Sequence, residues 1–230
     1  QVLEAALYAG INHIETAPSY GAAEKFLGTA LKKLEKQGRE PMGGWVITSK
    51  LLPGLNFSDG KRQIKDLLER LQVKSIDNLA IHGLNLAIHL EWALTGQGAD
   101  LFQWAKDEGL IKQIGFSSHG SFLLIQEALT SQKFDFCSLH LHLLNPDRIS
   151  LAHKAIENGM GVMAISPADK GGRLQSPSET LIGDCSPIEP LELAYRYLLA
   201  QGVSTLTLGA SQPSDITLAR KLMAANGPLD

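Results

Sequence analysis

The sequence predicts a (β/α)8 barrel, and three observations lead to this fold class. Short β-rich segments alternate with amphipathic helical segments along all 230 residues, which is typical of a parallel sheet covered by helices. Successive strands are spaced by roughly thirty residues, as in a barrel of eight βα units. No GxGxxG motif occurs, which disfavours an open doubly wound sheet that binds dinucleotides.

Apolar residues at helical spacing and β-rich runs bounded by glycine or proline define the elements of the first half. Gly10 and Gly38 follow predicted helices as stop signals, and Ser58 or Asp59 is the expected N-cap of the third helix. In chain order we expect helix 1–9, strand 12–16, helix 22–37, strand 45–50, helix 64–71, strand 76–82 and helix 99–108.

The second half continues the alternation. We expect strand 112–117, helix 122–129, strand 134–143, helix 151–157, strand 162–166, helix 191–200, strand 203–208 and helix 214–225. Seven strands result, and one more strand ahead of Gln1 would complete eight. The chain also begins without Met inside a predicted helix. We therefore expect residues 1–230 to be a single barrel domain, truncated at both ends and lacking the first strand.

The composition is that of a globular protein with a sizeable core, with 44% hydrophobic and 20% charged residues. The formal net charge of -3 gives no general attraction to nucleic acid or to an anionic membrane. Cys137 and Cys185 form no CxxC pair, which disfavours a disulfide framework and cysteine metal sites. Neither an apolar run of ~18 residues nor a secretory leader is present, so we expect a cytoplasmic location.

Four polar residues stand at or just beyond the ends of three successive predicted strands. They are Glu15 and Tyr20, which flank a short turn, followed by Lys50 and His82. Each has an ordinary structural interpretation: a buried acid, a loop tyrosine, a solvated lysine, a core histidine. Because chemistry in such barrels sits where strands end, the four together indicate a proton-donating site, in which a nearby Lys lowers the pKa of the phenol.

Several stretches in sequence order resemble the aldo-keto reductase superfamily: GINHIETAPSYG, WVITSK, IDNLAIHG, IKQIGFSSH, GVMAISP and LTLGASQPSDI. The HIET and LHLH runs resemble a microbial branch that often carries a C-terminal iron–sulfur segment, which is absent here. The resemblance implies carbonyl reduction with a nicotinamide cofactor, usually NADPH. By motif position the catalytic residues are Tyr20, Lys50 and His82, with Glu15 where the family has an Asp.

The resemblance also implies a set of cofactor-binding residues. Gly171 and Gly172 resemble part of a loop that closes over the pyrophosphate. The set is Ser117, Ser118, His140, Ser166, Gly209, Ser211 and Gln212. Arg220 and Asp215 near the last helix leave NADH possible beside NADPH. His140 and His142 share one strand face, but without an evident third ligand we expect no metal site.

We therefore expect an NAD(P)H-dependent oxidoreductase that reduces a small aldehyde or ketone, with Tyr20 as proton donor. The alternative is a catalytically weak nucleotide-binding or regulatory homologue, which the Glu15 substitution leaves open. An unrelated barrel lyase or isomerase, which would not bind nicotinamide, is a third possibility. The oligomeric state stays open.

Overall fold

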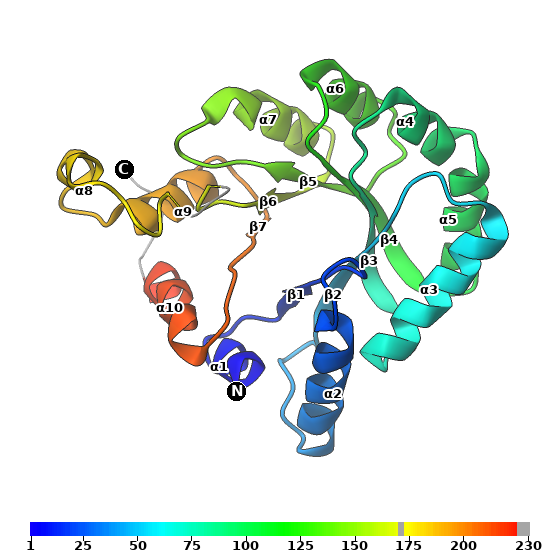
Figure 1. Cartoon of the computed structure of the whole chain (residues 1–230), viewed down its shortest axis with the longest axis horizontal. Coiled ribbons are helices and arrows are strands. Elements are labelled where there is room, and N and C mark those ends of the chain that lie inside the picture. The colour runs from blue at the N-terminus through cyan, green and yellow to red at the C-terminus, as the bar shows by residue number, and fades with distance from the viewer. Residues whose placement is uncertain (170–172, 225–230) are drawn as a thin grey trace. The chain divides into compact units, whose positions relative to one another are not determined.

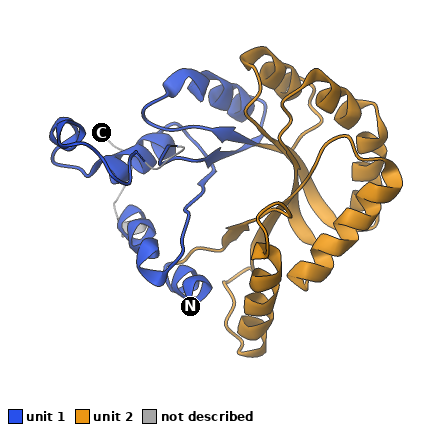
Figure 2. Cartoon of the chain, viewed as in Figure 1, with its two compact units in different colours: residues 1–9, 138–230 blue, residues 10–137 orange. Residues whose placement is uncertain are grey.

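The computed structural model describes residues 1–169 and 173–224. The chain divides into two compact units, shown in different colours in Figure 2. Unit 2 comprises residues 10–137, and unit 1 comprises residues 1–9 and 138–230. Figure 1 labels the helices and strands of both units.

Unit 2 contains parallel strands that alternate with helices. Its elements are β1 (His13–Glu15), α2 (Ala23–Lys36), β2 (Val46–Leu51), α3 (Phe57–Leu71), β3 (Ile76–His82), α4 (Ala87–Leu94), α5 (Gln97–Asp107), β4 (Ile111–Ser118), α6 (Phe122–Thr130) and the start of β5 (Phe136–His140). Strands β1 to β4 pair in chain order, each parallel to the next. This order confirms the parallel βα alternation expected from the sequence.

The two faces of β2 differ, which explains how unit 2 positions polar groups. Ile47 and Leu51 point to the side on which α2 and α3 pack and are 5% and 1% exposed. Thr48 and Lys50 alternate with them and therefore point to the opposite side. Helices α2 and α3 lie against one another, and α3 also contacts α5 (Figure 1). The apolar core of the unit thus lies between its sheet and these helices.

Unit 1 begins with α1 (Val2–Tyr8), which contacts the short helix η2 (Pro213–Ile216). After the end of β5 its elements are η1 (Pro146–Arg148), α7 (Ile149–Glu157), β6 (Gly161–Ile165), α8 (Glu179–Cys185), α9 (Pro190–Ala200), β7 (Thr205–Leu206), η2 (Pro213–Ile216) and α10 (Thr217–Ala224). Strands β6 and β7 are parallel, and α7 packs on β6. The described residues of the whole chain contain seven strands, as expected.

Some expected boundaries are wrong for local reasons. The N-cap of α3 is Asn56, whose side-chain oxygen accepts a 2.9 Å hydrogen bond from the Asp59 amide, and not Ser58 or Asp59. Helix α4 lies between strand 76–82 and helix 99–108, where no helix was expected. Helix α8 likewise lies between strand 162–166 and helix 191–200. Strands β5 and β7 are shorter than the apolar runs that contain them.

Candidate active site

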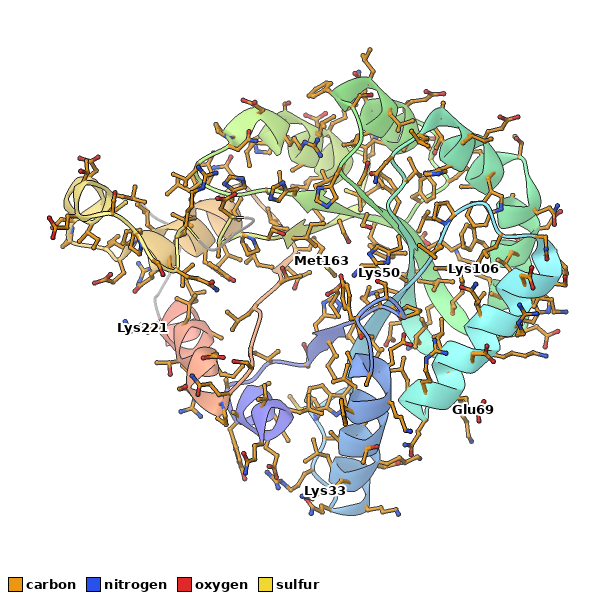
Figure 3. All side chains as sticks on the ribbon, in the orientation of Figure 1. Lys33, Lys50, Glu69, Lys106, Met163 and Lys221 are labelled. Carbon is orange, nitrogen blue, oxygen red and sulfur yellow. The ribbon has the colours of Figure 1, made fainter. Side chains whose placement is uncertain are left out.

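Three of the predicted site residues share one face of the unit 2 sheet. Glu15 ends β1, Lys50 precedes the last residue of β2, and His82 ends β3. In the parallel register Lys50 is the partner of Ala80, two residues before His82 on the same strand face. Lys50 is labelled in Figure 3, on the side of the sheet away from α2 and α3. The fold therefore brings these strand ends together, as the sequence predicted.

Lys50 is the most buried member of the group. Its side chain is 2% exposed, and its ammonium nitrogen contacts Glu15 Oε1 directly. The same nitrogen donates a 2.7 Å hydrogen bond to the Tyr20 hydroxyl oxygen. Burial lowers the pKa of Lys50 to about 8, whereas the Glu15 carboxylate favours the ammonium form. Because pH 7 lies below this pKa and Glu15 favours the charged form, the amine is protonated at pH 7.

Tyr20 lies in the loop between β1 and α2. Its side chain is half exposed, and its ring meets the His82 ring edge to face, with 5.9 Å between the ring centroids. Burial raises the pKa of the Tyr20 phenol above its ordinary value. The pKa is thus raised and not lowered, contrary to the expectation from Lys50, because burial penalises the charged phenolate. The phenol is therefore protonated at neutral pH.

His82 is held through one ring nitrogen. Its Nδ1 lies 3.3 Å from Ser19 Oγ. Burial, the Lys50 charge and His119 together lower the pKa of His82, so the ring is neutral at pH 7. A neutral imidazole held at Nδ1 can offer Nε2 to a ligand.

A second polar layer, which the sequence analysis missed, lies on the same sheet face. Thr48 Oγ1 lies 2.7 Å from His13 Nε2 and accepts a 2.9 Å hydrogen bond from Asn78 Nδ2. Burial lowers the pKa of His13, so this ring is also neutral. Each residue precedes Glu15, Lys50 or His82 by two or four positions along its own strand. Polar residues at strand period two were the sequence signal for this layer.

Glu24 was also missed. It is 1% exposed, and its carboxylate accepts hydrogen bonds of 2.7 Å from Ser49 Oγ and from Arg70 Nε. Because Ser49 precedes Lys50 on β2, this carboxylate ties the strand that carries Lys50 to α2 and α3.

The predicted cofactor residues of unit 2 are engaged with the backbone. Ser117 Oγ donates to the Ile81 carbonyl at 3.2 Å, and Ser118 Oγ donates to the Leu84 carbonyl at 2.6 Å. The Ser117 hydroxyl fastens the end of β4 to β3, and the Ser118 hydroxyl fastens it to the segment that follows β3. A ligand amide that binds at this strand end has to bond serine hydroxyl oxygens that are already hydrogen-bonded to the backbone.

The predicted cofactor residues of unit 1 stand in loops, apart from His140, which ends β5. Ser166 follows β6 with φ of 54°, a left-handed conformation that is uncommon for serine. Gly209 is exposed, with open space where a Cβ would be. Residues 171 and 172, expected to resemble part of the loop over the pyrophosphate, lie outside the described residues.

The amides of Ser211 and Gln212 do not fit a phosphate in this structure. Both donate to Asp215 Oδ2, at 2.8 and 3.1 Å, and Ser211 Oγ adds a third hydrogen bond. These bonds lower the pKa of Asp215, so the group on these amides is an ionised carboxylate. A phosphate would have to displace it.

Comparisons with known proteins place the chain among related sequences. The family model described as "Aldo/keto reductase family" matches residues 1–181. A curated aldo-keto reductase from Mycolicibacterium vanbaalenii is 29% identical over 220 residues, which cover 92% of this chain and 73% of that protein. No helix among the described residues has both the length and the apolar character needed to cross a membrane.

Solved structures show the same fold. The holo form of an aldo-keto reductase from Bacillus halodurans matches with a TM-score of 0.82 and 22% identity. The match covers 100% of this chain and 82% of the Bacillus halodurans chain. An aldo-keto reductase complexed with NADPH matches with a TM-score of 0.75 and 19% identity. The match covers 99% of this chain and 74% of the chain in that complex. The expected fold class, the (β/α)8 barrel, is confirmed, with seven strands in the described residues.

Proposed function

Because the chain belongs to the aldo/keto reductase family, we propose that it reduces a small aldehyde or ketone with a nicotinamide cofactor, Tyr20 being the proton donor. The observation that carries this proposal is the 2.7 Å hydrogen bond from Lys50 to the Tyr20 hydroxyl oxygen, with Glu15 in contact with the same ammonium. This arrangement holds a protonated phenol beside a cation that stabilises the phenolate formed when the proton leaves.

Each residue of the site has one task in the proposed reaction. A nicotinamide cofactor, when bound, would supply the hydride that the carbonyl carbon of the substrate accepts. Tyr20 gives its hydroxyl proton to the carbonyl oxygen, and Lys50 stabilises the remaining phenolate. Glu15 holds the ammonium of Lys50 in place. His82, neutral and fixed at Nδ1 by Ser19, donates from Nε2 to the substrate oxygen and orients it.

For the cofactor we propose NADPH, with NADH as the alternative, supported by the related structure complexed with NADPH. Ser117 and Ser118 are the proposed contacts of the nicotinamide carboxamide, since both lie at the carboxyl end of β4, where such barrels bind their ligands. Ser166 and Gly209 are proposed to lie beside the phosphates. Ser211 and Gln212 are not proposed as phosphate ligands while Asp215 occupies their amides.

The test is Tyr20→Phe in single-turnover reduction of a panel of small aldehydes, followed by the loss of reduced-nicotinamide absorbance. We expect the rate to fall about 10²–10⁴-fold. Cofactor affinity, measured by quenching of NADPH fluorescence, should stay unchanged because the phenol acts on the substrate. Tyr8→Phe, a change at an exposed residue of α1, is the matched control. Unchanged turnover in Tyr20→Phe would refute the assignment.

A second candidate is a nucleotide-binding homologue with little turnover. Glu15 favours it, since one additional methylene in place of the family's Asp alters the contact with Lys50. It predicts that the unmodified protein quenches NADPH fluorescence but oxidises no NADPH with any aldehyde of the panel.

A further inference from the structure

We propose that His140, His142 and Asp169 form a binding site for a divalent transition-metal ion of the zinc class. The three residues belong to unit 1, and each offers one ligand atom, all within 4.8 Å of one another. Two imidazoles and one carboxylate are a common ligand set for zinc and its first-row neighbours. In this proposal His140 binds the metal in place of the cofactor contact expected from the family resemblance.

The strand geometry brings the two histidines together. His140 ends β5, and His142 follows two residues later, on the same side by the period of the strand. Their ring centroids are 4.9 Å apart. From the sequence no metal site was expected at this pair, because no third ligand is evident there.

The third ligand comes from the loop after β6, which the sequence could not place. Asp169 has φ of 67°, and its amide donates a 3.0 Å hydrogen bond to the Ser166 carbonyl. This tight turn directs the carboxylate toward His142, and both side chains are only 4% exposed. Arg173 binds Asp169 through Oδ2, so Oδ1 remains on the side of His142.

The distance between these two side chains fits two ligands of one ion. His142 Nε2 and Asp169 Oδ1 lie 3.4 Å apart, beyond the usual N–H···O range of about 2.7–3.2 Å. Ligand bonds of about 2.0–2.2 Å in a tetrahedral site place neighbouring ligand atoms about 3.4 Å apart. Because the three ligand atoms lie within 4.8 Å of one another, the His140 nitrogen has to move inward by up to about 1.4 Å to complete the set.

The hydrogen-bonding state of His142 also favours an ion. If Nε2–H donated to Asp169, the buried Nδ1 would keep an unused lone pair, since Nδ1 has no hydrogen-bond partner among residues 1–169 and 173–224. If the proton were on Nδ1, the Nε2 lone pair would face a carboxylate oxygen. A cation between Nε2 and Oδ1 removes that repulsion.

The experiment is a titration of the chelator-treated full chain, without nicotinamide, with Co²⁺, followed by visible d–d absorption and by displacement with Zn²⁺. We expect a saturable one-to-one signal whose affinity falls at least about 10-fold in His140→Ala, His142→Ala and Asp169→Asn. His153→Ala is the matched control, because this exposed histidine lies on α7 and bonds Gln201.

Asp169→Asn keeps the shape of the side chain and so serves where a histidine variant fails to fold. As an independent measurement, Zn²⁺ should raise the thermal midpoint of the unmodified protein and not that of Asp169→Asn. The absence of a saturable Co²⁺ signal, or equal affinity in Asp169→Asn and His153→Ala, would overturn the proposal.

Discussion

The Lys50 ammonium nitrogen lies 2.7 Å from the Tyr20 hydroxyl oxygen and also contacts Glu15. In this relationship a nearly fully buried cation is balanced by a carboxylate on one side and directed at a half-exposed phenol on the other. The phenol is half exposed to solvent, whereas the ammonium is nearly fully buried and its counter-ion Glu15 is 18% exposed. The phenol that we propose as proton donor is therefore accessible, while the ammonium beside it is fixed.

We predict that the rate of carbonyl reduction falls as the pH rises through about 8. Burial lowers the pKa of Lys50 to about 8, so above this pH the ammonium becomes a neutral amine. A neutral amine no longer stabilises the phenolate left by Tyr20. The measurement is the pH profile of kcat with saturating cofactor.

Lys50→Met should reduce kcat about 100-fold and abolish the fall of kcat above pH 8, the alkaline limb of the pH profile. Lys106→Met, at a lysine on α5 that pairs with Asp135 and is also labelled in Figure 3, is the control and should keep the wild-type profile. A wild-type rate that stays constant well above pH 8 would show that Lys50 is not the titrating group.

Glu15→Gln should move the same limb to lower pH. The Glu15 carboxylate contacts the Lys50 ammonium and favours its charged form, so the uncharged amide lowers the pKa of Lys50 further. Glu15→Asp keeps the charge and serves as the control, with a limb close to that of the wild type. Coincident profiles for Glu15→Gln and the wild type would mean that the carboxylate does not support the ammonium.

The strand ends of unit 2 were predictable because period-two patterning and parallel topology are local rules. Glu15, Lys50 and His82 needed only the ends of β1, β2 and β3 to be placed correctly. Asp169 was not predictable, since its approach to His142 depends on a turn with positive φ at a non-glycine residue. Pattern rules do not foresee such a turn.

The helix α4 shows a second limit of the sequence. The segment after His82 is apolar nearly all round, so it lacks the one-sided stripe by which an amphipathic helix is recognised. It folds as a helix because Leu90 and Ala93 are buried and Trp92 Nε1 donates a 2.8 Å hydrogen bond to the Leu55 carbonyl. Tertiary contacts, which the sequence does not display, decide this element.

Arg70→Ala should lower the free energy of unfolding by about 3 kcal/mol, because it leaves the carboxylate of Glu24 buried with only Ser49 as partner. The measurement is urea denaturation followed by circular dichroism. Arg62→Ala on the same helix is the control, since Arg62 is 67% exposed, pairs with Asp59 and should contribute less than about 1 kcal/mol. Equal losses in the two variants would contradict a buried structural role for Glu24.

Gly28→Ala should destabilise the protein by about 3 kcal/mol through its effect on the contact between α2 and α3. A Cβ on Gly28 would meet the Arg70 carbonyl oxygen and lie 2.7 and 2.8 Å from the Leu71 carbonyl carbon and oxygen. Because these are backbone atoms, the two helices would have to separate.

Gly183→Ala on α8 is the matched control for Gly28→Ala. No atom lies within 4 Å of a Cβ built there, so the substitution removes only the entropic cost of a helical glycine. We expect the stability of this variant to rise by up to about 1 kcal/mol. Thermal unfolding of both variants distinguishes the two effects: a loss in Gly183→Ala as large as that in Gly28→Ala would show that the close contact with α3 is not the cause.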